Sequence, residues 1–186
     1  MKHCNKCCKK PKCDHICCDQ KHKNKCIKIK KTFGITDFDH PPTNPLAIIY
    51  AKHKLWVTRN GAGLITKHDL NGTLLATITV PVATGNPDSV GSPTGIVHNT
   101  GPNFIITNGP FSAPATLLAS TEDGLIVAYN PSVYLTVATT VVDRYNQNSV
   151  YTGLAVTSTN IYVADFYNGR IDTFGPTFNG PLSGFP

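Results

Sequence analysis

The sequence predicts an all-β body preceded by a basic arm, and three observations lead to this fold class. The chain has 186 residues, 40% of them hydrophobic and 15% charged, which suits one packed domain and excludes collagen, coiled coil and long disorder. From residue 46 onward, short runs rich in Val, Ile, Thr, Tyr and Leu alternate with Gly, Asn, Pro and Asp, the pattern of strands and turns. No segment has the period of an amphipathic helix. The sequence has no run of about 18 apolar residues, so it predicts no transmembrane helix.

Charge and cysteine content divide the chain into two regions. Residues 1–31 hold eleven lysines and two acids, whereas residues 32–186 hold three lysines, three arginines and nine acids. All seven cysteines lie between Cys4 and Cys26. Because such a break marks a boundary, we predict a disordered basic arm with its linker over residues 1–40 and the folded body over residues 41–186. No apolar stretch follows the first lysines, so the sequence predicts no secretory signal.

The arm has the residue types of a zinc site. Cys4-x-x-Cys7 and Cys13-x-x-x-Cys17 have the short spacing with which one turn supplies two ligands, so Cys4, Cys7, Cys13 and Cys17 are the candidate zinc ligands. Three alternatives stay open: disulfides, with at least one of seven cysteines left over; lipidated or simply reduced cysteines; and a disordered basic tail. The lysines also predict nonspecific contact with polyanions. Sequence-specific reading is not expected, since the arm has no aromatic residue and no arginine.

The body begins with strands that follow one another closely. The predicted strands are Leu46–Tyr50, Leu55–Thr58, Gly63–Asp69, Thr73–Val80, Gly95–His98, Phe104–Thr107, Ala115–Ser120, Gly124–Tyr129, Val137–Asp143, Gly153–Thr157, Ile161–Ala164 and Arg170–Phe174. Asn71-Gly72 predicts a hairpin turn, and Trp56 is expected in the core. The body's histidines have polar neighbours and are expected at the surface: His40, His53, His68 and His98.

These strands repeat in units roughly 50 residues apart. The units begin with Pro45-Leu-Ala-Ile-Ile, Pro93-Thr-Gly-Ile-Val and Thr152-Gly-Leu-Ala-Val. Their second strands are assigned to Leu55-Trp-Val-Thr-Arg-Asn60, Phe104-Ile-Ile-Thr-Asn-Gly109 and Ile161-Tyr-Val-Ala-Asp-Phe166, with an insert around Pro110–Thr121 in the second unit. Repeats of about 45–50 residues with three or four antiparallel strands are propeller blades. We therefore predict a partial β-propeller of about three four-stranded blades.

The third unit resembles an NHL-type repeat, through Thr152-Gly-Leu-Ala-Val, Ile161-Tyr-Val-Ala-Asp and Gly169-Arg-Ile-Asp-Thr-Phe. The longer string with Gly91-Ser-Pro-Thr-Gly-Ile-Val and Ser120-Thr-Glu-Asp-Gly-Leu-Ile is similar to an uncharacterised family of six-bladed β-propellers, known mostly from bacteria and often exported or at the surface. The resemblance spans roughly residues 40–180 and implies a fold but no activity.

Three blades are about half of such a ring. A half-ring leaves two apolar blade faces open, which soluble monomers rarely tolerate. Either two chains, or this chain and another protein, complete one ring, or the chain is a fragment of a longer ancestor. A two-fold pair would join the first blade of each chain to the third blade of the other.

The candidate body sites are polar residues that follow second strands. Asn108 and Asp165 take equivalent places in the repeat, together with Arg59 and Asn60, while Glu122 and Asp123 lie in a loop. Convergent oxygens in such places are the ligands of divalent cations in some six-bladed hydrolases. The competing interpretation is that Asn and Asp simply form turns there.

The leading hypothesis is a non-enzymatic interaction or structural module with a cysteine-rich tether. The lysine-rich composition and the absence of a signal point to a giant DNA virus as source, with the protein as a virion component. One alternative is a metal-dependent hydrolase acting at the propeller channel through Asn108 and Asp165. The other is a zinc-binding arm with nonspecific nucleic-acid association.

Overall fold

A computed structural model describes residues 44–182 of the chain, all within one unit, Thr36–Pro186. The predicted arm lies outside the described residues, and its boundary at residue 40 stays a prediction. The strands are β1 (Pro45–Ala51), β2 (Lys54–Arg59), β3 (Leu64–His68), β4 (Leu74–Thr79), β5 (Pro93–His98), β6 (Ile105–Asn108), β7 (Phe111–Pro114), β8 (Leu117–Thr121), β9 (Leu125–Tyr129), β10 (Thr139–Asp143), β11 (Tyr151–Val156), β12 (Ile161–Asp165) and β13 (Arg170–Phe174). Two 3-10 helices, η1 (Asn60–Ala62) and η2 (Tyr145–Gln147), complete the described part. No helix within residues 44–182 is long and apolar enough to cross a membrane.

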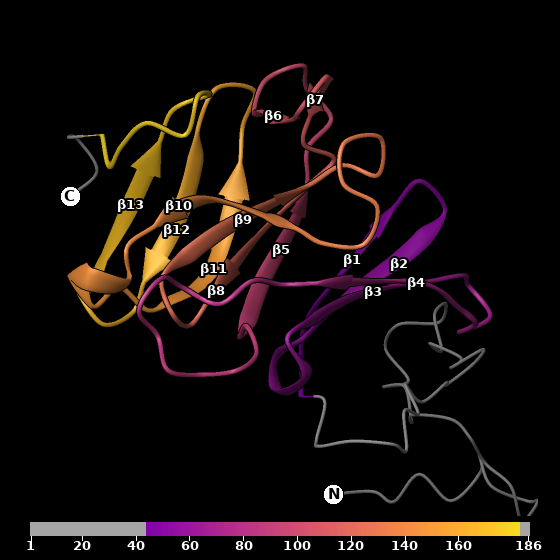
Figure 1. Ribbon diagram of the computed structural model, residues 1–186, viewed down its shortest axis with the longest axis horizontal. Coiled ribbons are helices and arrows are strands. Elements are labelled where there is room, and N and C mark those ends of the chain that lie inside the picture. Colours follow the sequence, from indigo (N-terminus) through magenta and orange to yellow (C-terminus); the bar gives the residue numbers. More distant parts are fainter. Residues whose placement is uncertain (1–43, 183–186) are drawn as a thin grey trace, which may run out of the picture. The chain divides into compact units, whose positions relative to one another are not determined.

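The strands form three antiparallel sheets that we call blades. Blade 1 has the order β1-β2-β3-β4, blade 2 the order β5-β8-β9-β10, and blade 3 the order β11-β12-β13 (Figure 1). In blades 1 and 3, short turns rich in Gly, Asn and Asp join successive runs of strand-forming residues into a meander. At Asn71-Gly72, for example, the Asp69 carboxylate accepts from the Asn71 and Thr73 amides, both at 2.8 Å.

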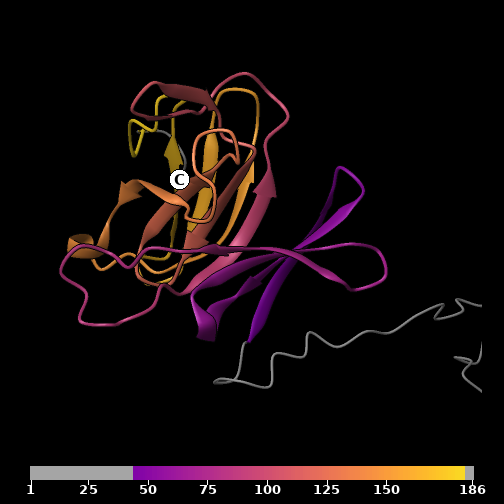
Figure 2. The same ribbon diagram turned by 45° about the vertical axis from the view of Figure 1, so that its right-hand side comes forward.

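The first strand of each blade lies toward a shared centre. β1 lies beside β5, and β5 lies beside β11, so the three blades follow one another around it (Figures 1 and 2). Outer strands also join, since Thr79 at the end of β4 pairs in parallel with Val137, just before β10. The predicted fold class, an all-β partial propeller, is therefore confirmed.

Two apolar cores lie between the blades. The first joins blade 1 to blade 2 and includes Trp56, Ile65, Ile96, Leu117 and Val127. The second joins blade 2 to blade 3 and includes Leu118, Ile126, Tyr151, Ile161 and Val163. Because alternate residues of a strand point to opposite faces, β8 gives Leu117 to one core and Leu118 to the other. Blade 2 is consequently buried on both sides, which is why every residue of β8 and β9 is buried.

The assignment of the second blade's strands was wrong in one respect. The strand of blade 2 that pairs with the inner strand β5 is β8, not the segment beginning at Phe104. That segment contains β6, which pairs with β7 in a separate hairpin at the upper end in Figure 1. The insert therefore lies between β5 and β8. It ends before Leu117, whereas the predicted range Pro110–Thr121 runs on to the end of β8.

Candidate functional site

The pairing registers show which residues of the three blades are equivalent. Thr58 lies opposite Ile65 in blade 1, Ser120 opposite Ile126 in blade 2, and Ala164 opposite Ile171 in blade 3. The inner strands follow the same alignment, so Ala47, Gly95 and Gly153 are equivalent. We call the side of a blade with these residues its front face, which is turned to the next blade, and the opposite side its rear face.

The contact between blades 1 and 2 combines apolar packing with one buried hydroxyl. Thr58 accepts a hydrogen bond from the Ala47 amide at 2.9 Å, within its own blade. It donates to the Thr94 carbonyl oxygen on the inner strand of blade 2 at 2.7 Å. Both partners are backbone groups, so this hydroxyl is fully used and fixes the relative height of the two inner strands.

The contact between blades 2 and 3 repeats this arrangement with a closer approach. Ser120 accepts from the Gly95 amide at 3.1 Å and bonds the Thr94 hydroxyl at 2.9 Å, while Thr94 donates to the Tyr151 carbonyl at 2.7 Å. Gly95 has no side chain because none fits: a Cβ there would lie 2.8 Å from the Gly153 Cα. Inner strands of successive blades thus meet backbone to backbone.

Blade 3 presents the same front face without a following blade. Gly153 occupies the place of Gly95, but no atom of residues 44–182 lies within 4 Å of where its Cβ would be. Ala155 and Ala164 on this face are exposed, and Ile171 is 37% exposed, whereas its equivalents Ile65 and Ile126 are buried. This front face has the glycine and the apolar positions of a blade contact without a described blade against it, and it is our candidate site.

Blade 1 has a complementary apolar edge on its rear face. Leu46, Ile48 and Tyr50 of β1 point away from blade 2 and are 54%, 60% and 60% exposed. Val57 and Thr66 follow on the same face in β2 and β3 and are buried, so the exposed apolar edge belongs to the inner strand. An inner strand is the element that packs against the glycine of a preceding blade, as β11 does on Gly95.

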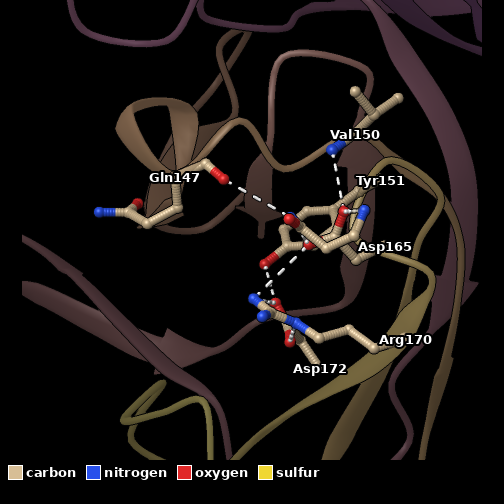
Figure 3. Close-up of polar contacts among 7 residues, drawn as sticks. Gln147, Val150, Tyr151, Asp165, Arg170 and Asp172 are labelled. Carbon is tan, nitrogen blue, oxygen red and sulfur yellow. Dashed lines mark hydrogen bonds and ion pairs between the residues drawn. The ribbon is translucent and has the colours of Figure 1, made fainter.

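Asp165, one of the predicted site residues, lies at the end of β12 in a buried polar network (Figure 3). Its Oδ2 accepts from the Asn168 side-chain amide at 2.7 Å, and its Oδ1 accepts from the Val150 amide at 3.2 Å. Arg170 Nη2 approaches the same carboxylate at 3.7 Å and also binds Asp172 through Nε at 2.7 Å. These contacts tie the segment before β11 to the turn between β12 and β13.

Electrostatics in this network follow from the same contacts. Burial alone would raise the pKa of Asp165, but hydrogen bonds from Asn168 and the Val150 backbone outweigh it and lower the pKa. Burial, and then the Asp172 carboxylate that accepts from the Tyr151 hydroxyl at 2.9 Å, raise the pKa of Tyr151 well above its usual range. Asp165 therefore stays charged and Tyr151 stays neutral at physiological pH. These protonation states let Asp165 accept its hydrogen bonds and let Tyr151 donate to Asp172.

Asn108 does not occupy the place that the repeat assigned to it. It ends β6 in the inserted hairpin, and its side-chain amide donates to the Val133 carbonyl at 3.3 Å, whereas Asp165 ends a blade strand. The residue of blade 2 equivalent to Asp165 is Thr121, which is buried and accepts from the Leu125 amide. Asn108 and Asp165 share no contact partner, so the structure does not bring them together.

The other predicted polar residues have structural partners. Asn60 donates to the Pro93 carbonyl at 3.4 Å across the first blade contact. Asp123 is buried and accepts from the Ala83 amide at 2.7 Å, which holds the segment between β4 and β5, while its neighbour Glu122 is exposed. Within residues 44–182, no three His, Cys, Asp or Glu side chains gather closely enough to hold a metal ion. Cys4, Cys7, Cys13 and Cys17 lie outside the described residues.

Among the histidines, the surface expectation was wrong for His68. It is buried and its imidazole bonds the Thr66 hydroxyl at 3.0 Å, whereas His53 is exposed. The sequence analysis also did not identify Gly153 as a site residue. Gly153 stands out because no described blade packs against it, and not because it belongs to a motif. Its signal was available, since a glycine recurs at the same place in Pro93-Thr-Gly and Tyr151-Thr-Gly.

Comparison with known proteins places the fold in context. No protein-family profile matches the chain. Two uncharacterised proteins of Acanthamoeba polyphaga mimivirus are 36% and 35% identical to it over 146 residues, which are 77% of this chain. The chain spans 38% and 36% of the length of these relatives.

A solved structure supports the propeller-like fold. It is a catalytically inactive virginiamycin B lyase from Staphylococcus aureus, crystallised with quinupristin, and it matches with a TM-score of 0.57. The match covers 83% of this chain and 45% of that protein at 16% sequence identity. Identity this low shows likeness of fold alone.

Proposed function

We propose that the chain is a non-enzymatic assembly module whose third blade takes the first blade of another copy, so that chains build a complete propeller from partial ones. The observation that carries this proposal is the front face of blade 3. It repeats the glycine that is covered in blade 2 and the apolar positions that are covered in blades 1 and 2, and it leaves them uncovered. The NHL-like blade sequence supports a ring of six blades, which two chains would supply.

The two contacts within the chain indicate how the docked blade would sit. In the contact of blade 2 with blade 3, Val97 and Leu154 belong to one core. Their equivalents at the proposed contact are Ala155 of one chain and Ile48 of the other. Each chain has both surfaces, so a two-fold arrangement closes with two identical contacts and exposes no further apolar blade face.

The first experiment measures the mass of the full chain in solution under reducing conditions by light scattering. The native chain is expected to be a dimer, and Ala155→Glu and Ile48→Lys are each expected to be monomers, because each places one charge in an apolar contact. The matched control is Phe111→Lys, which charges an equally exposed apolar side chain on the β6-β7 hairpin. A monomeric native chain would contradict the proposal.

Mixing the two charged variants sharpens the test. In a pair of one Ala155→Glu chain and one Ile48→Lys chain, one contact is native and the other brings opposite charges together. Mixing is therefore expected to restore a dimer that contains one chain of each variant. If the two variants stay monomeric together, the partner of blade 3 is not the rear face of blade 1.

The arm and the source of the relatives extend this proposal. The mimivirus origin of the relatives supports a role in the virion, and mass spectrometry of purified particles would test it. The arm would act as a tether, either by disulfides between chains or by zinc at Cys4, Cys7, Cys13 and Cys17. Masses with and without reductant, and zinc content before and after Cys4→Ser, separate these two forms of tether.

The divalent-metal hypothesis for Asn108 and Asp165 stays a separate prediction. It requires bound metal in protein that begins at residue 40, where the arm's cysteines are removed. Metal analysis of that protein and of its Asp165→Asn variant decides it, since a site would lose its metal in the variant.

A further inference from the structure

A cavity lies at one end of the contact between blades 1 and 2, and its lining is basic. Its volume is about 280 Å³, near the lower limit for sites of small ligands. Lys52, Lys54 and Lys67 line it, and they are the only lysines in residues 44–182. This part of the chain is acidic overall, with seven Asp and Glu residues in the described range, and none of them lines the cavity. Three lysines thus gather at a cavity whose described lining contains no carboxylate.

The lysines are not a general feature of blade packing. Lys54 is the first residue of β2, the strand that aligns with β8 and β12, so its equivalents are Thr116 and Asn160. Lys67 lies opposite Trp56 in β2, and its equivalents are Ala128 and Thr173. Because the other blades have neutral side chains at both places, a stable blade contact does not need the lysines.

The lysine side chains lie beside apolar and aromatic residues of the cavity. Lys67 Nζ lies 5.1 Å from the centre of the Trp56 ring, and Tyr129 approaches the same ring with centroids 6.3 Å apart. Within residues 44–182, no carboxylate lies within 4 Å of the three lysines. Lys52 is exposed, and Lys54 and Lys67 are partly buried. Their charges are therefore available to an anion from outside the described residues.

Two further observations mark the cavity. The Nε2 atom of His98, on the blade 2 side, is buried and has no hydrogen-bond partner among the described residues. Burial, and then the charge of Lys52, lower the pKa of His98, so the ring is neutral and can donate one hydrogen bond. The turn that places Lys52 is also strained: Lys52 and His53 both have left-handed φ, 50° and 59°, where Asn-Gly would be favoured.

We propose that this cavity binds a small organic anion in which a phosphate group is attached to a compact apolar ring. The three ammonium groups and His98 would bind the phosphate. Lysine binds phosphate as a point charge, and a phosphate dianion can interact with several ammonium groups at once. Ala51, Trp56, Ala76, Leu117 and Tyr129 match the ring. The cavity lies inside one chain, so the proposal does not depend on docking at blade 3 and fails or stands separately from it.

Trp56 offers a direct measurement, because it is the chain's only tryptophan and lines the cavity. The full chain is titrated with phenyl phosphate, with inorganic phosphate and with phenol, and Trp56 emission is recorded. Phenyl phosphate is expected to give a saturable change, inorganic phosphate to bind about tenfold more weakly, and phenol to give none. No saturable change with phenyl phosphate in the millimolar range would overturn the site. Equal binding of inorganic phosphate would overturn the apolar part.

The turn provides a matched pair of variants that keep the fold. Lys52→Asn removes one charge at the cavity, and asparagine tolerates the left-handed backbone better than lysine does. His53→Asn makes the same backbone change at the neighbouring residue, which does not line the cavity. Lys52→Asn is expected to weaken phenyl phosphate binding about tenfold and His53→Asn to leave it unchanged.

Two more variants separate the cavity from the basic arm. Lys54→Gln is expected to weaken binding like Lys52→Asn, whereas Lys10→Gln in the arm is expected to have no effect. If Lys10→Gln weakens binding and the cavity variants do not, the anion is held by the arm, and the proposed site is wrong.

Discussion

Blades 2 and 3 have strands in equivalent places and very different surroundings. In blade 2 both faces meet a neighbour, and β9 is buried at every residue. In blade 3 the rear face meets blade 2 and the front face does not, so β12 alternates between buried and more exposed residues. The comparison teaches that burial in this protein is decided by the neighbouring blade and not by the strand itself. Apolar residues at the front of blade 3 are therefore exposed because no described blade covers them.

The largest expected difference between the two blades concerns one isoleucine. Ile126→Ala leaves a cavity in a core where the side chain is fully buried, and it is expected to lower the free energy of unfolding by about 3 kcal/mol. Ile171→Ala removes the equivalent side chain from the open face and is expected to cost less than about 1 kcal/mol. Urea unfolding of both variants, in the Ala155→Glu background that prevents assembly, measures the two losses. Equal losses would show that the front face of blade 3 is covered within one chain.

A smaller difference is expected for the two equivalent glycines. Gly95→Ala forces a Cβ to within 2.8 Å of the Gly153 Cα and about 3.0 Å of Leu154 Cδ2, so we expect a loss of about 2 kcal/mol. Gly153→Ala meets no atom of the described residues within 4 Å and is expected to leave the monomer's stability nearly unchanged. In the native background it should weaken the dimer, because it places a methyl group where the next inner strand approaches. Thermal unfolding and light scattering on the two variants test both statements.

The smallest expected effect concerns the rear side of blade 3, where Tyr151 is buried against Asp172. The raised pKa of Tyr151 means that the folded protein keeps this proton while the unfolded chain loses it above pH of about 10. The contribution is therefore fully present below that pH and declines as the pH rises further. Tyr151→Phe is expected to cost about 1 kcal/mol at neutral pH and to reduce this alkaline decline. Unfolding measured between neutral and alkaline pH tests it, with the exposed Tyr167→Phe as control; an unchanged decline in Tyr151→Phe would contradict the assignment.

Much of the fold could be predicted, because strand signals here are local. The strand segments, the turn at Asn71-Gly72 and the buried Trp56 all follow from residue type and spacing. The assignment of strands to blade 2 could not be obtained in this way. Phe104-Ile-Ile-Thr-Asn has the same local pattern as a blade strand, and the prolines at 110 and 114 concealed β7, which pairs with it.

The candidate sites were harder to predict, because they depend on which residues meet in space. Asp165 does lie at a strand end, but its partners Asn168 and Arg170 could be identified only from the fold. Its role as a site residue stays a prediction. Asn108 was placed by the mistaken alignment. Lys52 and Lys67 are far from His98 in the sequence, so no spacing rule connects them. Gly153 is the exception, since the repeated glycine was visible in the sequence.

The β6-β7 hairpin has a consequence for protein engineering. It leaves the chain between β5 and β8, and the blade closes without it because β5 still pairs with β8. A junction that already accommodates a folded excursion accepts foreign peptide at low energetic cost, since loop length adds little to the entropy of closure. The tip at Asn108-Gly109 is therefore a natural point for grafting an epitope or an affinity tag without disturbing the scaffold.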